Sequence, residues 1–137
     1  MNQTTNFGLN QWNPTDRIRM EDFNADNAKI DAALGKAGNC EVVTGSYVGT
    51  GTVGQQGANT LTFSKRPLLL IIMGTYTMIV PGIIDTGRTI PTACGYDTFN
   101  DFTWQGNTIR WHNGGNMVYC QLNTDGETYH YIAIYAN

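Results

Sequence analysis

The stretch FTWQGNTIRWH, residues 102–112, decides the fold that the sequence predicts. Gly106-Asn107 is a two-residue turn signal between two runs that alternate apolar and polar residues, the pattern of a β-hairpin. Such a turn pairs Trp104 with Ile109 and Phe102 with Trp111, so these four side chains share one face. The polar side chains take the other face: Asp101, Thr103, Gln105, Thr108, Arg110 and His112.

Outward from this hairpin, most of the chain reads as short strands separated by Gly, Asn, Asp and Pro. The apolar run 68–73 predicts a buried strand, since a bilayer span needs about 20 apolar residues. Many short strands with regular turn signals predict an antiparallel β-sandwich. The predicted strands are residues 41–48, 60–63, 68–73, 77–84, 88–94, 102–105, 108–112, 117–122 and 128–135.

The last two strands predict a second hairpin, which turns at Asp125-Gly126. Its simplest register puts on one face Val118, Cys120, Leu122, Tyr129, Tyr131 and Ala133. The other face carries Met117, Tyr119, Gln121, His130, Ile132 and Ile134. Both faces are substantially apolar, whereas a lone sandwich buries only one face of each sheet. We therefore expect a neighbouring subunit to cover the second face.

The chain divides near Gly38 into a loop and helix, residues 1–38, and a β-sandwich tip domain, residues 39–137. Asp16 or Thr15 is placed to cap the helix start, and the pattern ends at Leu34-Gly35, with Gly suited to a left-handed cap. The positions spaced as in a heptad seam are Met20, Phe23, Asn27, Ile30 and Leu34. A short isolated helix is marginal in water. The narrow stripe and its single Asn favour self-association as a trimer over packing on its own domain.

Composition excludes several function classes. The 137-residue chain has a formal net charge of −3 and only 8 Lys and Arg, so no basic patch for nucleic acid is visible. Charged residues make up 14% of it, and Gly, Asn and Thr take their place. No basic segment followed by an apolar run opens the sequence, so we expect no signal peptide.

The three cysteines, Cys40, Cys94 and Cys120, are widely spaced and form no pair with metal-ligand spacing. Their odd number argues against a disulfide framework, so we expect buried free thiols. His112 and His130 lack the spacing of a metal pair. We expect no metal and no cofactor, and an Asp101–His112 pair across the hairpin as a surface contact.

Two motifs suggest other chemistries. Residues 49–54 match GxGxxG, but no helix start and no later acidic residue follow, so they predict a flexible Gly-rich loop instead of a nucleotide site. Asp85-Thr86-Gly87 matches the motif of aspartic proteases, in which two such carboxylates share a proton. Arg88 follows it, and a cation there would hold the carboxylate of Asp85 ionised. We expect an ordinary turn and a non-enzymatic chain, with a retropepsin-like protease as a distant alternative.

Aromatic residues gather in the middle of the chain, where the segment 95–101 combines rings with Asp and Asn. Sugar sites often join an aromatic platform to such polar groups. The candidate ligand-binding residues are Tyr76, Tyr96, Asp97, Asn100, Asp101, Trp104 and Trp111. The alternative is that the rings fill the core and a subunit interface, as large aromatics usually do.

Three parts of the chain resemble a known family. They are residues 6–12 (NFGLNQW) with Thr15-Asp16 and 22–34 (DFNADNAKIDAAL); residues 45–51 (GSYVGTG) with 61–63 and Arg66-Pro67; and residues 123–134 (NTDGETYHYIAI). They resemble tail-fibre proteins of phages and prophages of Gram-positive gut bacteria. The family pattern has an acidic residue after the Trp, where this chain has Asn13-Pro14. The middle of the chain, about residues 74–116, carries no resemblance.

The resemblance implies a homotrimer that binds a cell-surface receptor, often a glycan, alongside other tail proteins. It implies a place in the virion tail fibre, assembled in the bacterial host cytoplasm. The sequence therefore predicts a mainly β, lectin-like fibre-tip module with a short trimerising helix, which binds neither nucleic acid nor membrane. A purely structural trimeric stalk or cap without a ligand is the alternative.

Overall fold

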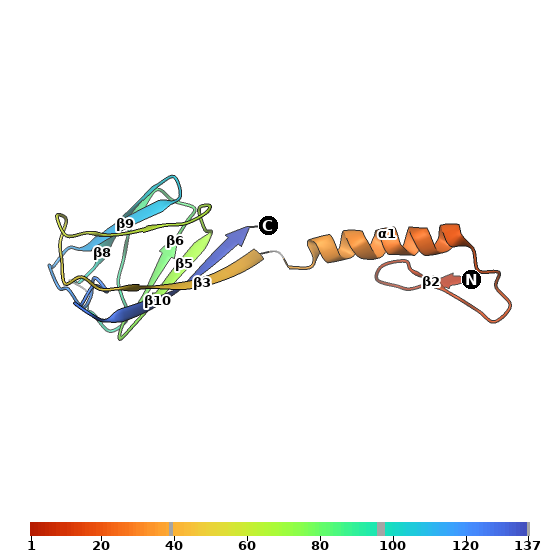
Figure 1. The fold of residues 1–137 in the computed structure, drawn as a ribbon, viewed down its shortest axis with the longest axis horizontal. Coiled ribbons are helices and arrows are strands. Elements are labelled where there is room, and N and C mark those ends of the chain that lie inside the picture. Colours follow the sequence, from red (N-terminus) through yellow and green to blue (C-terminus); the bar gives the residue numbers. More distant parts are fainter. Residues whose placement is uncertain (39, 96–97, 137) are drawn as a thin grey trace. The chain divides into compact units, whose positions relative to one another are not determined.

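The computed structural model describes residues 1–38, 40–95 and 98–136. It is mainly β, with antiparallel sheets and one helix, as the sequence predicts (Figure 1). The chain forms two compact units, Met1–Asn39 and Cys40–Asn137, here called the N-terminal unit and the β unit.

The N-terminal unit holds strands β1 (Asn2–Gln3) and β2 (Asn10–Gln11), which pair antiparallel, and helix α1 (Met20–Lys36). The helix begins later than predicted, because neither Thr15 nor Asp16 caps it. Arg19 occupies the N-cap without a side-chain hydrogen bond. The Asp16 carboxylate instead accepts a bond from the Asn13 N–H (2.8 Å), which lowers the pKa of Asp16.

The end of the helix also differs from the prediction. Gly35 lies inside the last turn, and the N–H of Ala37 donates to the carbonyl of Leu34 (3.1 Å). The left-handed backbone lies at Gly38, with φ of 96°. The predicted Gly35 cap is therefore wrong, and the helix runs to Lys36.

One face of α1 is covered by the preceding loop through polar contacts. The Asp26 carboxylate accepts a bond from the Asn10 N–H (3.0 Å), and Lys29 Nζ donates to the Gly8 carbonyl. The Trp12 ring stacks on Phe23, with centroids 5.9 Å apart. The seam side chains all remain exposed: Met20, Phe23, Asn27, Ile30 and Leu34. The unit therefore covers a polar helix face and, apart from the Trp12 ring on Phe23, leaves the apolar seam exposed.

The β unit contains two four-stranded antiparallel sheets (Figure 1). The first, here the β10 sheet, has the order β3 (Cys40–Val48), β10 (Thr128–Ala136), β5 (Leu69–Met73) and β6 (Thr77–Pro81). The second, here the β9 sheet, has the order β4 (Asn59–Thr62), β9 (Thr108–Asn113), β8 (Asn100–Gln105) and β7 (Thr86–Thr89).

The β8–β9 hairpin has the predicted register. Phe102 lies opposite Trp111, Trp104 opposite Ile109, and Asp101 opposite His112. All four apolar members are buried. Together with apolar side chains of the β10 sheet, and with Phe63 and Leu122 from the loops, they form one core: Phe63, Leu70, Ile72, Met78, Val80, Phe102, Trp104, Ile109, Trp111, Leu122, Tyr129, Ala133 and Tyr135. The two sheets thus bury one face each against a shared core.

The predicted hairpin at Asp125-Gly126 is wrong. Residues 117–122 form no strand, and residues 118–122 form turns, in which the Gln121 N–H donates to the Met117 carbonyl (2.9 Å) and Leu122 has a left-handed φ of 60°. Strand β10 pairs instead with β3 and β5. The predicted strand 88–94 is also displaced, because Thr86–Thr89 forms β7 and Ala93 has a left-handed φ of 65°.

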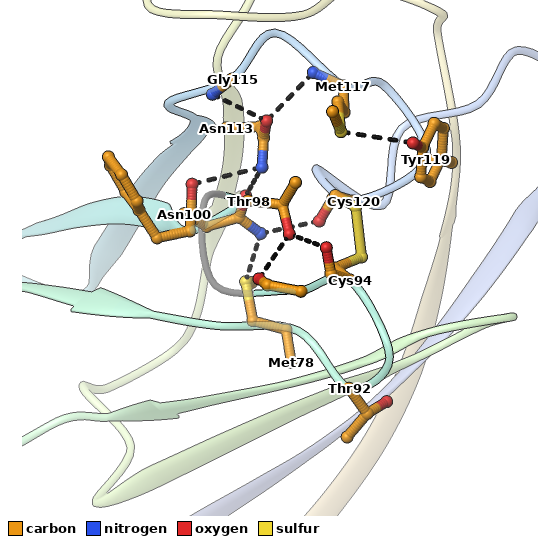
Figure 2. The surroundings of a disulfide bond; sticks show 12 residues. Met78, Thr92, Cys94, Thr98, Asn100, Asn113, Gly115, Met117, Tyr119 and Cys120 are labelled. Carbon is orange, nitrogen blue, oxygen red and sulfur yellow. Dashed lines mark hydrogen bonds between the residues drawn. A yellow bond between two sulfur atoms is a disulfide. The ribbon is translucent and has the colours of Figure 1, made fainter.

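The expectation of buried free thiols is wrong as well. Cys94 and Cys120 form a disulfide (Figure 2). Cys40 is free and exposed. Asn100, on β8, donates through Nδ2 to the Cys120 carbonyl (2.9 Å). The disulfide therefore ties the segment after β7 to the turns that replace the predicted strand 117–122. A disulfide that closes a long loop lowers the conformational entropy of the unfolded chain and so stabilises the folded state.

Candidate functional site

The outward face of the β9 sheet contains a polar hollow of about 380 Å³. It is lined by Gln55, Thr60, Asp101, Thr103, Gln105, Thr108, Arg110 and His112. Most of these are the polar side chains of the β8–β9 hairpin, which alternate with the buried aromatic and aliphatic ones. The hollow is therefore a direct result of strand alternation: the core takes one side of the hairpin, and the hollow takes the other.

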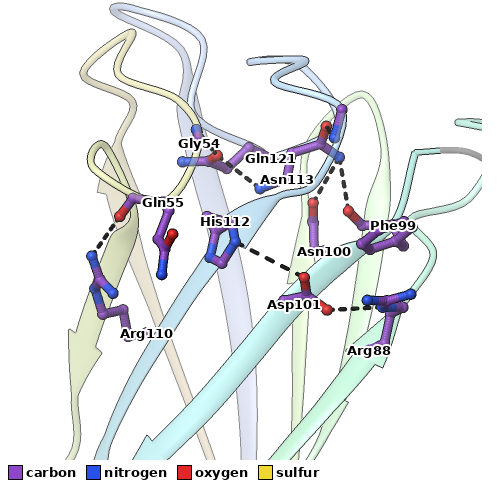
Figure 3. Close-up of polar contacts among 11 residues, drawn as sticks. Gly54, Gln55, Arg88, Phe99, Asn100, Asp101, Arg110, His112, Asn113 and Gln121 are labelled. Atoms are coloured by element: carbon purple, nitrogen blue, oxygen red, sulfur yellow. Dashed lines mark hydrogen bonds and ion pairs between the residues drawn. The ribbon is translucent and has the colours of Figure 1, made fainter.

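A charged row crosses one end of the hollow. Arg88 Nε donates to an Asp101 carboxylate oxygen (2.8 Å), and His112 Nε2 lies 3.9 Å from the other oxygen (Figure 3). The Arg88 guanidinium also lies 3.7 Å from the centroid of the Phe99 ring. These contacts hold Asp101 in place with its charge already balanced by Arg88.

Arg110 supplies the opposite wall. Its Nη2 donates to the carbonyl of Gln55, which ties the Gly-rich loop to strand β9 (Figure 3). Within the described residues, Arg110 forms no ion pair with a carboxylate. The hollow therefore has a cation whose other N–H groups remain available for a ligand.

Two buried amides hold the Gly-rich loop that carries Gln55. The Gln121 Oε1 accepts bonds from the N–H groups of Gly54 and Asn113 (both 2.9 Å), and its Nε2 donates to the Gly57 carbonyl (2.8 Å). Asn123 Nδ2 donates to the Thr52 carbonyl (2.8 Å). The sequence predicted a flexible loop, whereas these bonds hold its backbone on both sides of Gln55, which lines the hollow.

Of the predicted ligand-binding residues that the structure describes, only Asp101 lines the hollow. Trp104 and Trp111 are in the core, 3% and 0% exposed, with their Nε1 groups donating to the carbonyls of Pro81 and Gln121. A buried ring offers no platform to a sugar, which corrects the expectation for both tryptophans. The alternative prediction, that the aromatic rings fill the core, is correct for Trp104 and Trp111.

The remaining predicted positions divide into three cases. Asn100 is fully buried and bonds to Cys120, Met78 and Asn113, so its amide is structural. Tyr76 is half-buried, and its ring centroid lies 5.7 Å from that of Tyr119, away from the hollow lining. Tyr96 and Asp97 lie outside the described residues.

Sequence reasoning missed seven of the hollow-lining residues as a site: Gln55, Thr60, Thr103, Gln105, Thr108, Arg110 and His112. The signal was present, because most of them form the polar face of the predicted hairpin. A row of polar side chains on an outward strand face is also the ordinary pattern of a solvated surface, so the pattern alone does not mark a site.

The Asp-Thr-Gly motif lies apart from the hollow lining. The Asp85 side chain is 80% exposed and forms an ion pair with Arg66 (2.8 Å). The cation beside it is therefore Arg66, whereas the expected Arg88 pairs with Asp101. Among the residues that the structure describes, no three His, Cys, Asp or Glu side chains gather as metal ligands.

Comparisons with known proteins bring no relative. No family model matches the chain, and no curated protein or solved structure resembles it significantly. No helix in the described part of the chain is long and apolar enough to cross a membrane.

Proposed function

We propose that the chain is a receptor-binding module of a phage-type tail fibre, which acts as a homotrimer and binds a cell-surface glycan. The β unit is then a lectin-like sandwich at the fibre tip, in the virion beside other tail proteins. The observation that carries the binding part of this proposal is the polar hollow on the β9 sheet, with its fixed walls of Gln55 and Arg110.

The chemistry of the hollow suits sugar hydroxyl groups. Thr60 and Thr103 offer hydroxyls that both donate and accept, and Gln105 offers an amide. The Thr108 hydroxyl also faces the hollow, and one of its hydrogen bonds goes to Thr62 (2.8 Å). The Asp101 carboxylate accepts from a hydroxyl, and the free N–H groups of Arg110 donate to one. Because these side chains stand on paired strands, their positions are set before a ligand arrives, which lowers the entropy cost of binding.

The trimer part of the proposal is supported by the N-terminal unit. Met20, Ile30 and Leu34 are 74%, 41% and 67% exposed, although their spacing is that of a helix seam. An apolar stripe left open by its own unit is the surface that a coiled coil buries.

The same exposed seam also supports the purely structural alternative, a stalk or cap without a ligand. The seam accounts for assembly, and assembly does not require a ligand. The two readings differ only at the hollow. Binding to whole host cells and to a glycan array, including bacterial wall polysaccharides, separates them.

The decisive variants are Thr103→Val, which removes a hydroxyl from the hollow at nearly the same size, and Arg110→Gln, which removes the positive charge and reduces the N–H donors from five to two. Each should weaken binding by about tenfold or more, as expected for the loss of a hydrogen bond or a charge-assisted one. The matched control is Thr86→Val, at an exposed position on β7 outside the hollow lining. If the folded hollow variants bind cells as well as wild type does, the hollow is not the site. If wild type binds neither cells nor glycans, the stalk reading holds.

The retropepsin-like alternative predicts acid-dependent peptide cleavage through Asp85. We expect Asp85→Asn to bind cells as wild type does, because its carboxylate forms only an exposed pair with Arg66. Cleavage of peptides at acidic pH by wild type but not by Asp85→Asn would overturn the non-enzymatic proposal.

A further inference from the structure

The outward face of the β10 sheet is apolar, in contrast to that of the β9 sheet. Its side chains lie in cross-strand rows, read in the order β3, β10, β5, β6. One row contains Val42, Ile134, Leu69 and Pro81, and the next contains Thr44, Ile132, Ile71 and Ile79. They alternate along the strands with core residues such as Leu70, Ile72 and Ala133, so they point away from the core.

These rows reach the surface at both edges of the sheet. Val42 on β3 is 58% exposed, and Ile79 on β6 is 52% exposed. Between them Ile71, Ile132 and Ile134 are half-buried by their neighbours on the same face. Four adjacent strands thus present a continuous apolar surface, and such patches often mark interaction sites.

The same face carries no formal charge. The third row contains Ser46, His130, Met73 and Thr77, so none of the three rows includes Asp, Glu, Lys or Arg. The outward face of the β9 sheet, by comparison, carries Arg88, Asp101 and Arg110. A charged partner would find nothing complementary on the β10 sheet, and a sugar would find few donors. A second copy of the same uncharged face can meet it without desolvating any ion.

The outward face of the β10 sheet is smaller than a stable protein–protein interface, so the assembly needs a second contact surface. Four strands about 4.8 Å apart and five residues long make a patch of about 14 Å by 17 Å. A stable interface buries about 800 Å² on each partner, so the patch supplies only a part of it. The exposed seam of α1 is a second apolar surface on the same chain, and other copies of the chain offer a matching surface to each.

We infer that the outward face of the β10 sheet, centred on Ile71, Ile132 and Ile79, packs against other copies of the chain in the assembly. The β units then contact one another directly, and the helix seam is one of two self-association surfaces. This inference rests on the proposed homotrimer and adds to it a second interface, on the sheet that faces away from the ligand hollow.

The test compares Ile79→Lys with Thr86→Lys in the full chain, by sedimentation over a range of concentrations. Both positions are exposed and lie on the edge strands of the two sheets, β6 and β7, so the same ammonium group is added to opposite outer faces. Ile79→Lys should raise the dissociation constant of the assembly by more than about tenfold, because unpaired ammonium groups would be buried. Thr86→Lys should leave it unchanged.

Two further variants separate this inference from the homotrimer itself. Val42→Lys adds the charge at the opposite edge of the same face and should weaken assembly as Ile79→Lys does. It keeps the inference testable if Ile79→Lys folds poorly. Ile30→Lys on the helix seam should weaken assembly independently. If Ile30→Lys dissociates the assembly but Val42→Lys and Ile79→Lys do not, the sheet interface is wrong and the helical homotrimer stands. If wild type is monomeric throughout, both are wrong.

Discussion

At the scale of single residues, a few buried polar groups organise the surface that the ligand is proposed to meet. Gln121 is fully buried, far along the chain from the Gly-rich loop, and both ends of its amide are used. Tyr47 lies between the rings of Trp111 and Tyr129, with centroids at 5.9 Å and 5.2 Å. Its hydroxyl donates to the Leu122 carbonyl (2.7 Å), where the backbone is left-handed.

Gln121→Glu should destabilise the β unit by about 3 kcal/mol at neutral pH, since a buried carboxylate would replace a donating amide. Its oxygens would face the Gly57 carbonyl and the Asn59 Oδ1, which now accept bonds from Nε2. Urea unfolding of the full chain measures the change. Gln56→Glu adds the same charge at an exposed position of the same loop and should change stability little. Equal midpoints for the two variants would contradict the role given to Gln121.

Tyr47→Phe should alter how stability depends on alkaline pH. Burial raises the pKa of the Tyr47 phenol above its usual value near 10. The stability that this group contributes is complete below pH of about 10 and is lost as the pH rises above it, because only the unfolded chain releases the proton. At neutral pH the variant should lose about 1 kcal/mol with the bond to Leu122. Above pH of about 10 its stability should fall less steeply than that of wild type; parallel curves from pH 8 to 11 would exclude this coupling.

At the scale of elements, α1 carries a heptad seam whose side chains remain exposed in the N-terminal unit. The loop before it covers the face of Asp22, Asp26 and Lys29 through hydrogen bonds. The seam, with Asn27 between Phe23 and Ile30, stays open. A polar residue at such a position lowers stability and selects one register and oligomer state.

Asn27→Ile should raise the melting temperature of the assembly and broaden the range of oligomers, because it replaces an amide on the proposed axis with an apolar side chain. Asn27→Asp should lower the melting temperature at neutral pH, since it brings like charges together, and should recover as the carboxylates protonate on acidification. Calorimetry combined with light scattering, at pH 7 and pH 4, measures both effects. If both variants melt as wild type does, Asn27 faces solvent in the assembly.

At the scale of the whole chain, the two sheets of the β unit have different surfaces. The outward side chains of the β9 sheet are polar and form the hollow, and those of the β10 sheet are apolar and uncharged. Such a division suits a module that binds a ligand on one sheet and its own copies on the other.

Light scattering of the full chain at micromolar concentration should give three times the 15.1 kDa chain mass. The melting temperature should rise with concentration, because assembly stabilises the folded state by mass action. A dimer would preserve self-association but not the threefold arrangement, and a monomer would exclude both.

What the sequence by itself determined is local. The register of the hairpin at residues 102–112 followed from a two-residue turn and a period of two, both of which act within a dozen residues. The helix and the mainly β class followed from similar short-range patterns. The polar face of the hairpin, and so most of the hollow, was also visible there.

Only the tertiary structure decided which distant segments meet. Strand β10 pairs with β3 and β5 and not with residues 117–122. Because residues 118–122 form turns instead of the predicted strand, Cys120 lies within reach of Cys94, and the two form a disulfide. The burial of Trp104 and Trp111, and the wall that Gln55 forms, depend on the same packing. Pairing between distant strands is selected by how well two sheets fill a common core, a property of many side chains together that no local pattern contains.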